Sequence, residues 1–146
     1  ENTIPFDCLE NQVLKNGKPF LGICVGMQVL GDVGHEFEER NGFGWIPGSV
    51  EKLTVAEATL PHIGWNDIVL KKDVPLFRNL KEFRDFYFVH SYHLTVKHHD
   101  HVLAYTEYEK PFSSIVSKDN IFGFQFHPEK SQKAGQLLLN NFIQFS

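Results

Sequence analysis

The chain has 146 residues, of which 42% are hydrophobic and 22% charged, and its net charge at pH 7 is −4. This length is sufficient for one domain with a hydrophobic core and too short for two domains of ordinary size. The acidic balance argues against a nucleic-acid-binding protein, and the longest apolar run, residues 20–30, is too short for a membrane helix. No signal-peptide pattern is present, and Cys8 and Cys24 form no disulfide framework, so a cytoplasmic protein is expected.

The first third of the chain alternates helix and strand signals. Leu9, Val13 and Leu14 recur at helical spacing, and the glycine at position 17 is expected to end that helix. Residues 19–23 form a short apolar run that predicts a buried strand. Residues 28–30 are expected to begin a helix, which the glycines at positions 31 and 34 would end.

The middle of the chain is rich in β-branched and aromatic residues, interrupted by Gly, Pro and Asp, and predicts several strands. The expected strand segments are residues 42–53, 62–72, 85–96, 101–109 and 112–117. Residues 117–120, SKDN, predict a hairpin turn.

A helix is expected at the C-terminus, after Pro128, with Ser131 as its N-cap. Its apolar face consists of Ala134, Leu137, Leu138, Phe142 and Phe145. Because the chain contains no repeat and no linker, we expect one α/β domain over residues 1–146, with an antiparallel, β-rich middle section.

The sequence KPFLGICVGMQ, residues 18–28, places Cys24 at the end of the predicted strand. A glycine-flanked turn from strand to helix exposes such a side chain at the carboxyl end of the sheet, where α/β sheets bind ligands. A helix N-terminus lowers a thiol pKa, and the N–H of Val25 would face a developing oxyanion. The alternative is that Cys24 simply fills the core, since free cysteines are often buried.

A candidate base for this thiol lies in FGFQFHPEK, residues 122–130. His127 ends a predicted strand, and residues two apart in an extended segment point the same way. Glu129 is therefore expected to accept a hydrogen bond from one ring nitrogen of His127 and to leave the other for the thiol. Taken alone, HPE is also compatible with an ordinary surface loop.

These two segments, in this order, resemble class I, or triad, glutamine amidotransferases. Two inner segments, PHIGWNDI (residues 61–68) and YFVHSYH (residues 87–93), resemble the glutaminase subunits of imidazole glycerol phosphate synthase, which serve histidine biosynthesis. The resemblance covers nearly the whole chain. It implies a flavodoxin-like, three-layer α/β sheet that is incomplete at its N-terminus.

The resemblance also implies roles by position. Cys24 would be the nucleophile, His127 the general base and acid, and Glu129 the residue that orients it. The oxyanion would be bound by the N–H of Val25. The side chain of Gln28 would help to hold glutamine. Backbone groups of three further residues would bind its amino-acid end: His90, Ser91 and Tyr92. No cofactor and no metal are expected.

By the same resemblance, ammonia would pass to a cyclase subunit with a (β/α)8 barrel. The residues expected at or near this partner are Ile63, Trp65, Asn66, Tyr87 and Lys130. Trp and Tyr are typical interface anchors, although aromatic residues in strands are also compatible with a simple core.

The family has about sixty further residues before the point where this sequence starts, and they form strands beside the central parallel strand. They also carry a glycine loop that donates a second oxyanion N–H. We therefore expect an N-terminally truncated domain in which the strand at residues 18–23 has an open edge, and we expect self-association through the exposed sheet.

Two other functions stay open: a related amidotransferase that feeds another synthase, such as one acting on a surface sugar, and a truncated interaction module without activity. The histidine cluster at residues 98–101 lacks Cys or Glu partners at metal-site spacing and predicts a solvated turn. His35 and His62 are isolated. Residues 36–40 predict a charged, exposed face.

Overall fold

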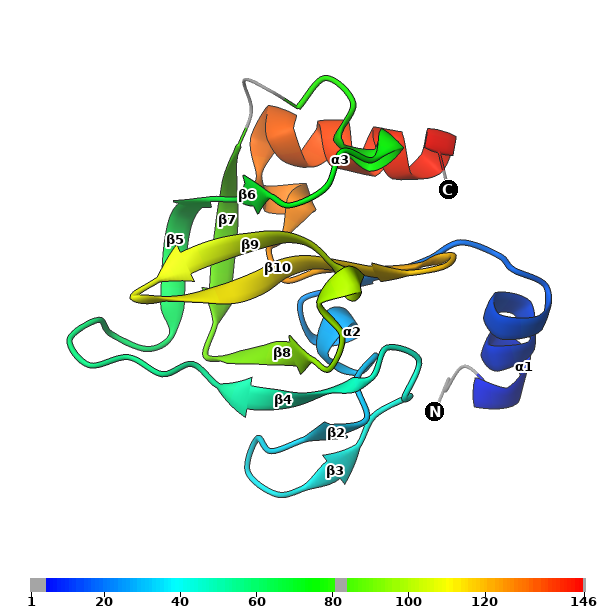
Figure 1. Ribbon diagram of the computed structural model, residues 1–146, viewed down its shortest axis with the longest axis horizontal. Coiled ribbons are helices and arrows are strands. Elements are labelled where there is room, and N and C mark those ends of the chain that lie inside the picture. Colours follow the sequence, from blue (N-terminus) through cyan, green and yellow to red (C-terminus); the bar gives the residue numbers. More distant parts are fainter. Residues whose placement is uncertain (1–4, 81–83, 146) are drawn as a thin grey trace.

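The computed structural model describes residues 5–80 and 84–145, apart from the side chain of residue 145. The helices are α1 (Phe6–Glu10), a π-helix η1 (Asn11–Lys15), α2 (Val25–Gln28) and α3 (Gln132–Phe145), with 3₁₀ turns η2 (Pro75–Phe77), η3 (His99–His101) and η4 (Pro128–Lys130). The strands are β1 (Phe20–Ile23), β2 (Val33–Gly34), β3 (Arg40–Asn41), β4 (Gly48–Lys52), β5 (His62–Asp67), β6 (Val69–Leu70), β7 (Asp85–His90), β8 (Tyr92–Val96), β9 (Val102–Tyr108), β10 (Lys110–Lys118) and β11 (Ile121–Phe124). Figure 1 shows how these elements are arranged.

The largest sheet among the described residues has the strand order β1-β11-β10-β9-β6. Its only parallel pair is β1 with β11, and every other neighbouring pair is antiparallel. The predicted SKDN turn is confirmed, because it joins β10 to β11 and contains Asp119 at φ 54°. The parallel pair brings together two strands that are about a hundred residues apart in the sequence, so that β1 and β11 finish at the same edge of the sheet.

Strand β1 lies at the end of this sheet, and in the described part of the chain β11 is its one partner. The backbone N–H groups of Phe20 and Cys24 point toward β11, where they donate to Asn120 O at 3.0 Å and Phe124 O at 2.7 Å. Among residues 5–80 and 84–145 no strand pairs with the opposite edge of β1, as expected from the family resemblance.

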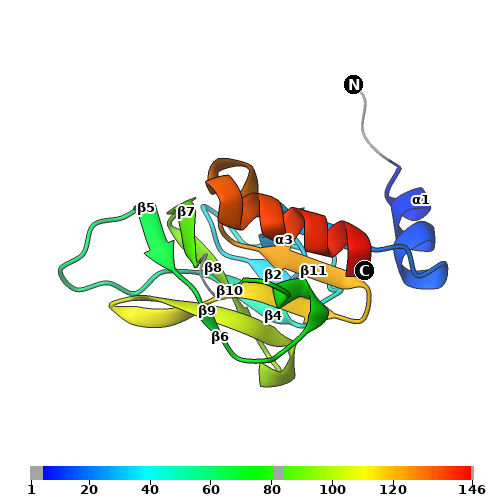
Figure 2. The same cartoon turned by 90° about the horizontal axis from the view of Figure 1, so that it is seen from above.

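Helix α3 covers one face of the large sheet (Figure 2). Ala134 and Leu138 are buried, and Leu137 and Phe142 are half-buried against the same core. Phe145, the last residue of the predicted face, has its side chain outside the described set. Asn141, which the periodicity did not mark, is also buried and donates to the carbonyls of Leu76 and Arg78, so it holds η2 onto the helix.

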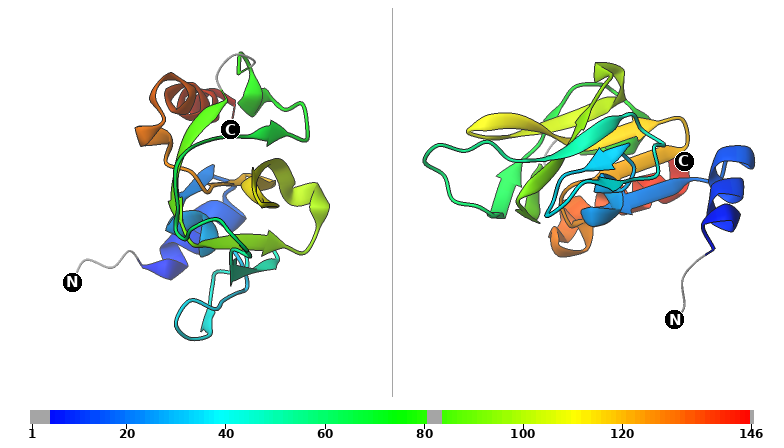
Figure 3. Two further views of the ribbon diagram at one scale, coloured as in Figure 1. Left: turned by 90° about the vertical axis from the view of Figure 1, so that its left-hand side faces the viewer. Right: turned by 90° about the horizontal axis from the view of Figure 1, so that it is seen from below.

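The described residues also form two smaller sheets, β3-β2-β4-β8 and the ribbon β5-β7. Since β7 and β8 are separated by Ser91 alone, the two sheets meet at that residue. Figure 3 shows these sheets beside the large one. Along β5 the exposure alternates, with His62 buried and Ile63 and Trp65 exposed.

The helix predicted to begin at residues 28–30 was placed too late. Helix α2 begins at Val25, directly after Cys24, and ends at Gln28. Gly31 then packs so closely against β8 that a Cβ at this position would lie 2.6 Å from Leu94 Cδ1. The chain turns here and continues as β2 instead of extending the helix. No helix in the described ranges is long and apolar enough to cross a membrane.

Candidate active site

Cys24 occupies a sharp turn between β1 and α2. Its backbone has φ 55° and ψ −108°, a conformation that is strained for a non-glycine residue. The backbones of the strand and the helix pack so closely that a Cβ on Gly22 would lie 2.2 Å from Gly26 O. The Cys24 side chain is half-buried, so it reaches the surface and does not simply fill the core.

His127 lies just beyond β11, the parallel partner of β1. Ile23 pairs with Phe124, so the residues after both strands emerge at one edge. His127 Nδ1 is 2.7 Å from Glu129 Oε1. The expected extended geometry is wrong in detail, since residues 128–130 form the 3₁₀ turn η4, but the carboxylate still reaches the ring.

The other ring nitrogen of His127, Nε2, is buried and has no hydrogen-bond partner among the described residues. With Nδ1–H donating to Glu129, Nε2 carries a free lone pair and is able to accept a proton. No hydrogen bond joins it to Cys24 in residues 5–80 and 84–145. The Cys24 sulfur instead lies 3.9 Å from Val89 O and 3.7 Å from Gln125 Nε2.

Ser131 was expected to cap α3, but its hydroxyl has a different role. It accepts a hydrogen bond from Tyr87 N at 2.9 Å and donates to His127 O at 2.6 Å. His127 N also donates to Tyr87 O, at 2.9 Å. These three bonds hold the His127 segment against β7. Ser131 does occupy the position before α3, where its carbonyl accepts from Gly135 N at 3.2 Å, but among the described residues its hydroxyl makes no bond to the helix N-terminus.

The thiol of Cys24 has a raised pKa, above its ordinary value of 9.0. Burial is the largest cause, and the Val25 N–H acts in the opposite direction. The carboxylates of Glu129 and Glu36 raise the pKa further, and Lys130 lowers it. At neutral pH the group is therefore a thiol, and it needs a base to become a nucleophile.

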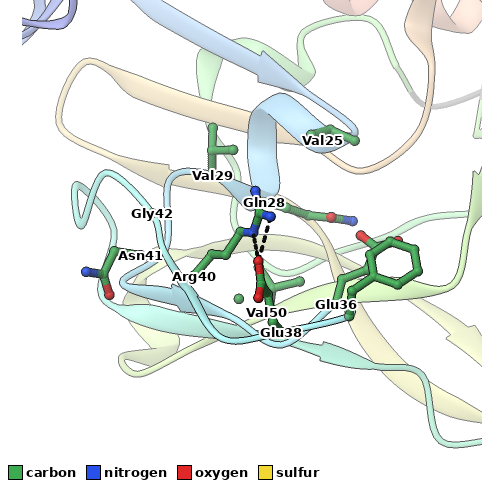
Figure 4. Close-up of a pocket in the computed structure, with 11 residues that line it drawn as sticks. Val25, Gln28, Val29, Glu36, Glu38, Arg40, Asn41, Gly42 and Val50 are labelled. Carbon is green, nitrogen blue, oxygen red and sulfur yellow. Dashed lines mark hydrogen bonds and ion pairs between the residues drawn. The ribbon is translucent and has the colours of Figure 1, made fainter.

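A cavity of about 350 Å³ opens beside α2 and is lined by Val25 and Gln28 (Figure 4). Across it lie Glu36, Glu38 and Arg40, from the segment expected to be a charged, exposed face. These residues are exposed as predicted, but they also form one wall of the cavity. Arg40 pairs with Glu38 at 2.6 Å, whereas Glu36 forms no ion pair in the described part of the chain.

Gln28 is fixed by hydrogen bonds on the inner side of the cavity. Its Nε2 donates to Tyr92 O at 3.0 Å and to Gln125 Oε1 at 3.2 Å. The carbonyl of Ser91 accepts from Leu53 N at 2.9 Å. The segment expected to bind glutamine is thus positioned by the protein's own contacts.

His90, at the end of β7, is buried together with His62. His90 Nδ1 donates to Tyr92 O at 2.9 Å, and His62 Nδ1 is 3.0 Å from His90 Nε2. Asn66 Nδ2 lies 3.3 Å from His62 Nε2. Burial lowers the pKa of both histidines to about 4, so both rings are neutral at pH 7. His62, which appeared isolated in the sequence, is part of the core beneath the site.

The residues expected at a partner interface lie on and beside the β5–β7 ribbon. Ile63 and Trp65 are 58% and 51% exposed, so Trp65 is a surface residue and not a core residue. Tyr87 packs edge-on against Trp65, with ring centroids 5.9 Å apart. Lys130 is exposed in η4, while Asn66 is half-buried and donates to Glu107 O at 3.0 Å.

Two side chains that contact this site were missed from the sequence: Glu36 and Gln125. Gln125 is completely buried, and a lone amide within the apolar run FGFQF was the only signal for it. His99 and His101 lie in η3 and His98 precedes it, and in the described ranges no group of three or more His, Cys, Asp or Glu side chains is arranged to hold a metal ion.

The similarity to known proteins extends over nearly the whole chain. The family model for glutamine amidotransferase class-I matches residues 7–145. The imidazole glycerol phosphate synthase subunit HisH of Ruegeria pomeroyi is 43% identical over 143 residues, covering 97% of this chain and 68% of that protein. HisH of Methanocaldococcus jannaschii is 43% identical over 144 residues, covering 99% of this chain and 72% of that protein. The chain thus spans about two thirds of these relatives.

Solved structures show the same fold. A glutamine amidotransferase from Thermotoga maritima aligns with a TM-score of 0.56 and 23% identity, over 94% of this chain and 50% of that one. Another solved glutamine amidotransferase gives a TM-score of 0.59 at 16% identity, over 93% of this chain and 67% of that one. The expected α/β architecture of these enzymes is confirmed. The chain belongs to the class I glutamine amidotransferase family, and among its members it is similar to the HisH subunits.

Proposed function

We propose that Cys24, His127 and Glu129 form a catalytic triad that hydrolyses the side-chain amide of glutamine to glutamate and ammonia. The observation that carries the proposal is the parallel pairing of β1 and β11, which ends both strands at one edge of the sheet. A strained cysteine follows one strand, and a histidine held by a carboxylate follows the other. This combination is the arrangement of a nucleophile, a base and an orienting acid.

The chemistry follows from the free lone pair of His127 Nε2. This nitrogen takes the thiol proton as the Cys24 sulfur attacks the amide carbon, and the Val25 N–H binds the resulting oxyanion. Collapse of the tetrahedral intermediate breaks the C–N bond, and His127 returns the proton to the leaving ammonia. A water molecule then hydrolyses the thioester to glutamate and regenerates the thiol.

The cavity beside Gln28 suits the amino-acid end of glutamine. Both amide hydrogens of Gln28 are used within the protein, so its Oε1 is left to accept a hydrogen bond from a ligand. Glu36 supplies a carboxylate without an ion-pair partner in the described residues, which fits an α-ammonium group. We place the substrate's amino-acid end here, with backbone groups of residues 90–92 alongside.

We also propose a partner. The similarity to HisH subunits supports transfer of ammonia to a cyclase subunit of imidazole glycerol phosphate synthase, in histidine biosynthesis. The exposed Ile63 and Trp65, with Tyr87 and Lys130 nearby, would form the contact, and Asn66 would support it from within. Residues 1–146 would act as a single glutamine amidotransferase domain in the cytoplasm, where both cysteines stay reduced.

Glutamate release from glutamine, measured with and without a cyclase subunit, tests this function. We expect release that the cyclase increases, abolition in Cys24→Ser, and a loss of about 10²–10⁴-fold in His127→Gln. The matched controls, Cys8→Ser and His99→Gln, change exposed residues away from the site and should leave release unchanged. Release that survives Cys24→Ser contradicts the triad. Binding to the cyclase without any release would instead indicate an inactive interaction module, and stimulation only by another synthase would indicate a related amidotransferase.

A further inference from the structure

A chain of hydrogen bonds between side-chain amides runs beneath the candidate nucleophile. It begins at the carbonyl of Tyr92, passes through Gln28 and Gln125, and ends at the Cys24 sulfur. Gln125 has no exposed surface and lies between two buried phenylalanines, Phe124 and Phe126. Burying an amide costs free energy unless its polar atoms form hydrogen bonds, so the bonds that Gln125 makes should explain why an amide stands here.

The donor and acceptor of each hydrogen bond in this series follow from the first acceptor, the carbonyl oxygen of Tyr92. A backbone carbonyl only accepts, so the Gln28 atom that contacts Tyr92 O, at 3.0 Å, is the NH₂ group. The same NH₂ contacts Gln125 at 3.2 Å, and therefore the Gln125 atom there is its carbonyl oxygen. The Gln125 NH₂ is left facing the Cys24 sulfur at 3.7 Å. The sulfur thus receives a donor, which favours a negatively charged thiolate over a neutral thiol.

We propose that Gln125 is a catalytic residue of this site, which donates a hydrogen bond to the Cys24 thiolate and holds it toward the substrate while Gln28 fixes the orientation of its amide. The inference rests on the proposed role of Cys24 as nucleophile. In the thiol form, the S–H points to Val89 O, at 3.9 Å. When His127 takes the proton this contact is lost, and the Gln125 N–H is the donor that remains on the buried side of the sulfur.

The other groups that influence Cys24 lie toward the solvent. Glu129 and Glu36 oppose the thiolate, and Lys130 and the Val25 N–H favour it. His127 stands beside Glu129 and favours the thiolate once it is protonated. The side chains of Glu36, Glu129 and Lys130 are exposed, so salt screens their effect, whereas the contribution of a fully buried amide persists at high salt.

The test is the pH dependence of Cys24 alkylation by iodoacetamide at high salt, followed by mass spectrometry of the full chain. Gln125→Met keeps the side-chain length and removes the donor. We expect the midpoint of the Cys24 profile to rise by about one pH unit, a tenfold loss of thiolate at neutral pH. Gln125→Glu should raise it further, because an anion then faces the sulfur. Cys8, which is exposed, serves as an internal reference in every sample.

Ser114→Ala is the matched control, since Ser114 is fully buried on the neighbouring strand and makes no side-chain hydrogen bond in the described residues. Its profile should not move. If Gln125→Met does not fold, Gln28→Leu can be used instead. It removes the hydrogen bond between Gln28 and Gln125 and should shift the midpoint in the same direction by a smaller amount. An unmoved midpoint in the folded variants overturns the inference. Glutamate release is measured separately, so a shifted midpoint without release would count against the proposed function and not against the contact.

Discussion

At the scale of single residues, the site depends on which atoms are left without partners inside the protein. Within the described part of the chain, His127 has one ring nitrogen bound to Glu129 and one without a partner, and Gln28 has both amide hydrogens used and its oxygen without a partner. Each side chain is thereby held in one tautomer or one orientation. This preorganisation is what a nucleophilic mechanism needs before the substrate arrives.

The buried histidine pair gives a prediction about acid stability. His62 and His90 have pKa values of about 4 in the folded protein, below their ordinary value of 6.5. Between these values the unfolded chain binds protons that the folded chain does not. The free energy of unfolding should therefore be highest above pH 6.5 and fall as the pH decreases toward 4, by at most about 1.4 kcal/mol per pH unit for each histidine.

Urea unfolding at a series of pH values measures this dependence. His62→Phe retains the stacking on Tyr108 and removes one titrating group, so its slope between pH 6.5 and 4 should be shallower than that of the wild type. His99→Gln, an exposed change, should keep the wild-type slope. Parallel slopes for His62→Phe and the wild type would show that His62 titrates normally in the folded state.

At the scale of elements, the turn between β1 and α2 depends on glycine at one position and tolerates a side chain at another. A Cβ on Gly22 would lie 2.2 Å from Gly26 O, whereas a Cβ on Gly26 meets nothing within 4 Å. Gly22→Ala should therefore displace Cys24, destabilise the fold by about 1–3 kcal/mol and reduce glutamate release. Gly26→Ala should be neutral or slightly stabilising, because alanine is the better helix former.

Thermal unfolding and glutamate release of the two variants, measured side by side, provide the comparison. Similar behaviour of Gly22→Ala and Gly26→Ala would contradict the close packing of β1 against α2.

The sequence predicted the parts of the fold that depend on neighbours along the chain. The SKDN hairpin, the strand at β1 and the apolar face of α3 follow from local pattern, as does the association of His127 with Glu129 two residues later. The length of α2 and the role of Gln125 do not. The first depends on Gly31 packing against Leu94, and the second on contacts with Cys24 and Gln28 about a hundred residues away. Periodicity contains no information about such partners.

At the scale of the whole molecule, two surfaces are available for other chains. One is the open edge of β1. Because the N–H groups of Phe20 and Cys24 point to β11, those of Leu21 and Ile23 point to the open edge. Such an edge pairs readily with another chain, so we expect the isolated protein to self-associate.

Light scattering tests this expectation. Leu21→Pro removes one outward N–H without touching a β1–β11 hydrogen bond and should reduce association. Leu21→Val keeps the N–H and should associate as the wild type does. A strictly monomeric wild type, or equal association in both variants, would contradict pairing through this edge.

The other surface is the β5–β7 ribbon around Trp65. Trp65→Ala should weaken binding of a cyclase subunit by about 2 kcal/mol, roughly thirtyfold, and leave the free energy of unfolding within about 1 kcal/mol. Ile143→Ala, an exposed change on α3, is the control and should alter neither. Titration calorimetry and urea unfolding separate the two effects. A large loss of stability with unchanged binding would make Trp65 a structural residue.

The proposed function requires Cys24 to be a nucleophile that His127 activates. Labelling with a glutamine-like electrophile, mapped by mass spectrometry, tests it most directly, because the chain contains one other cysteine, Cys8, which is exposed and has no base assigned to it. We predict fast labelling of Cys24, slow labelling of Cys8, and loss of the difference in His127→Gln. Equal labelling of the two cysteines in the wild-type chain would show that Cys24 is not an activated nucleophile.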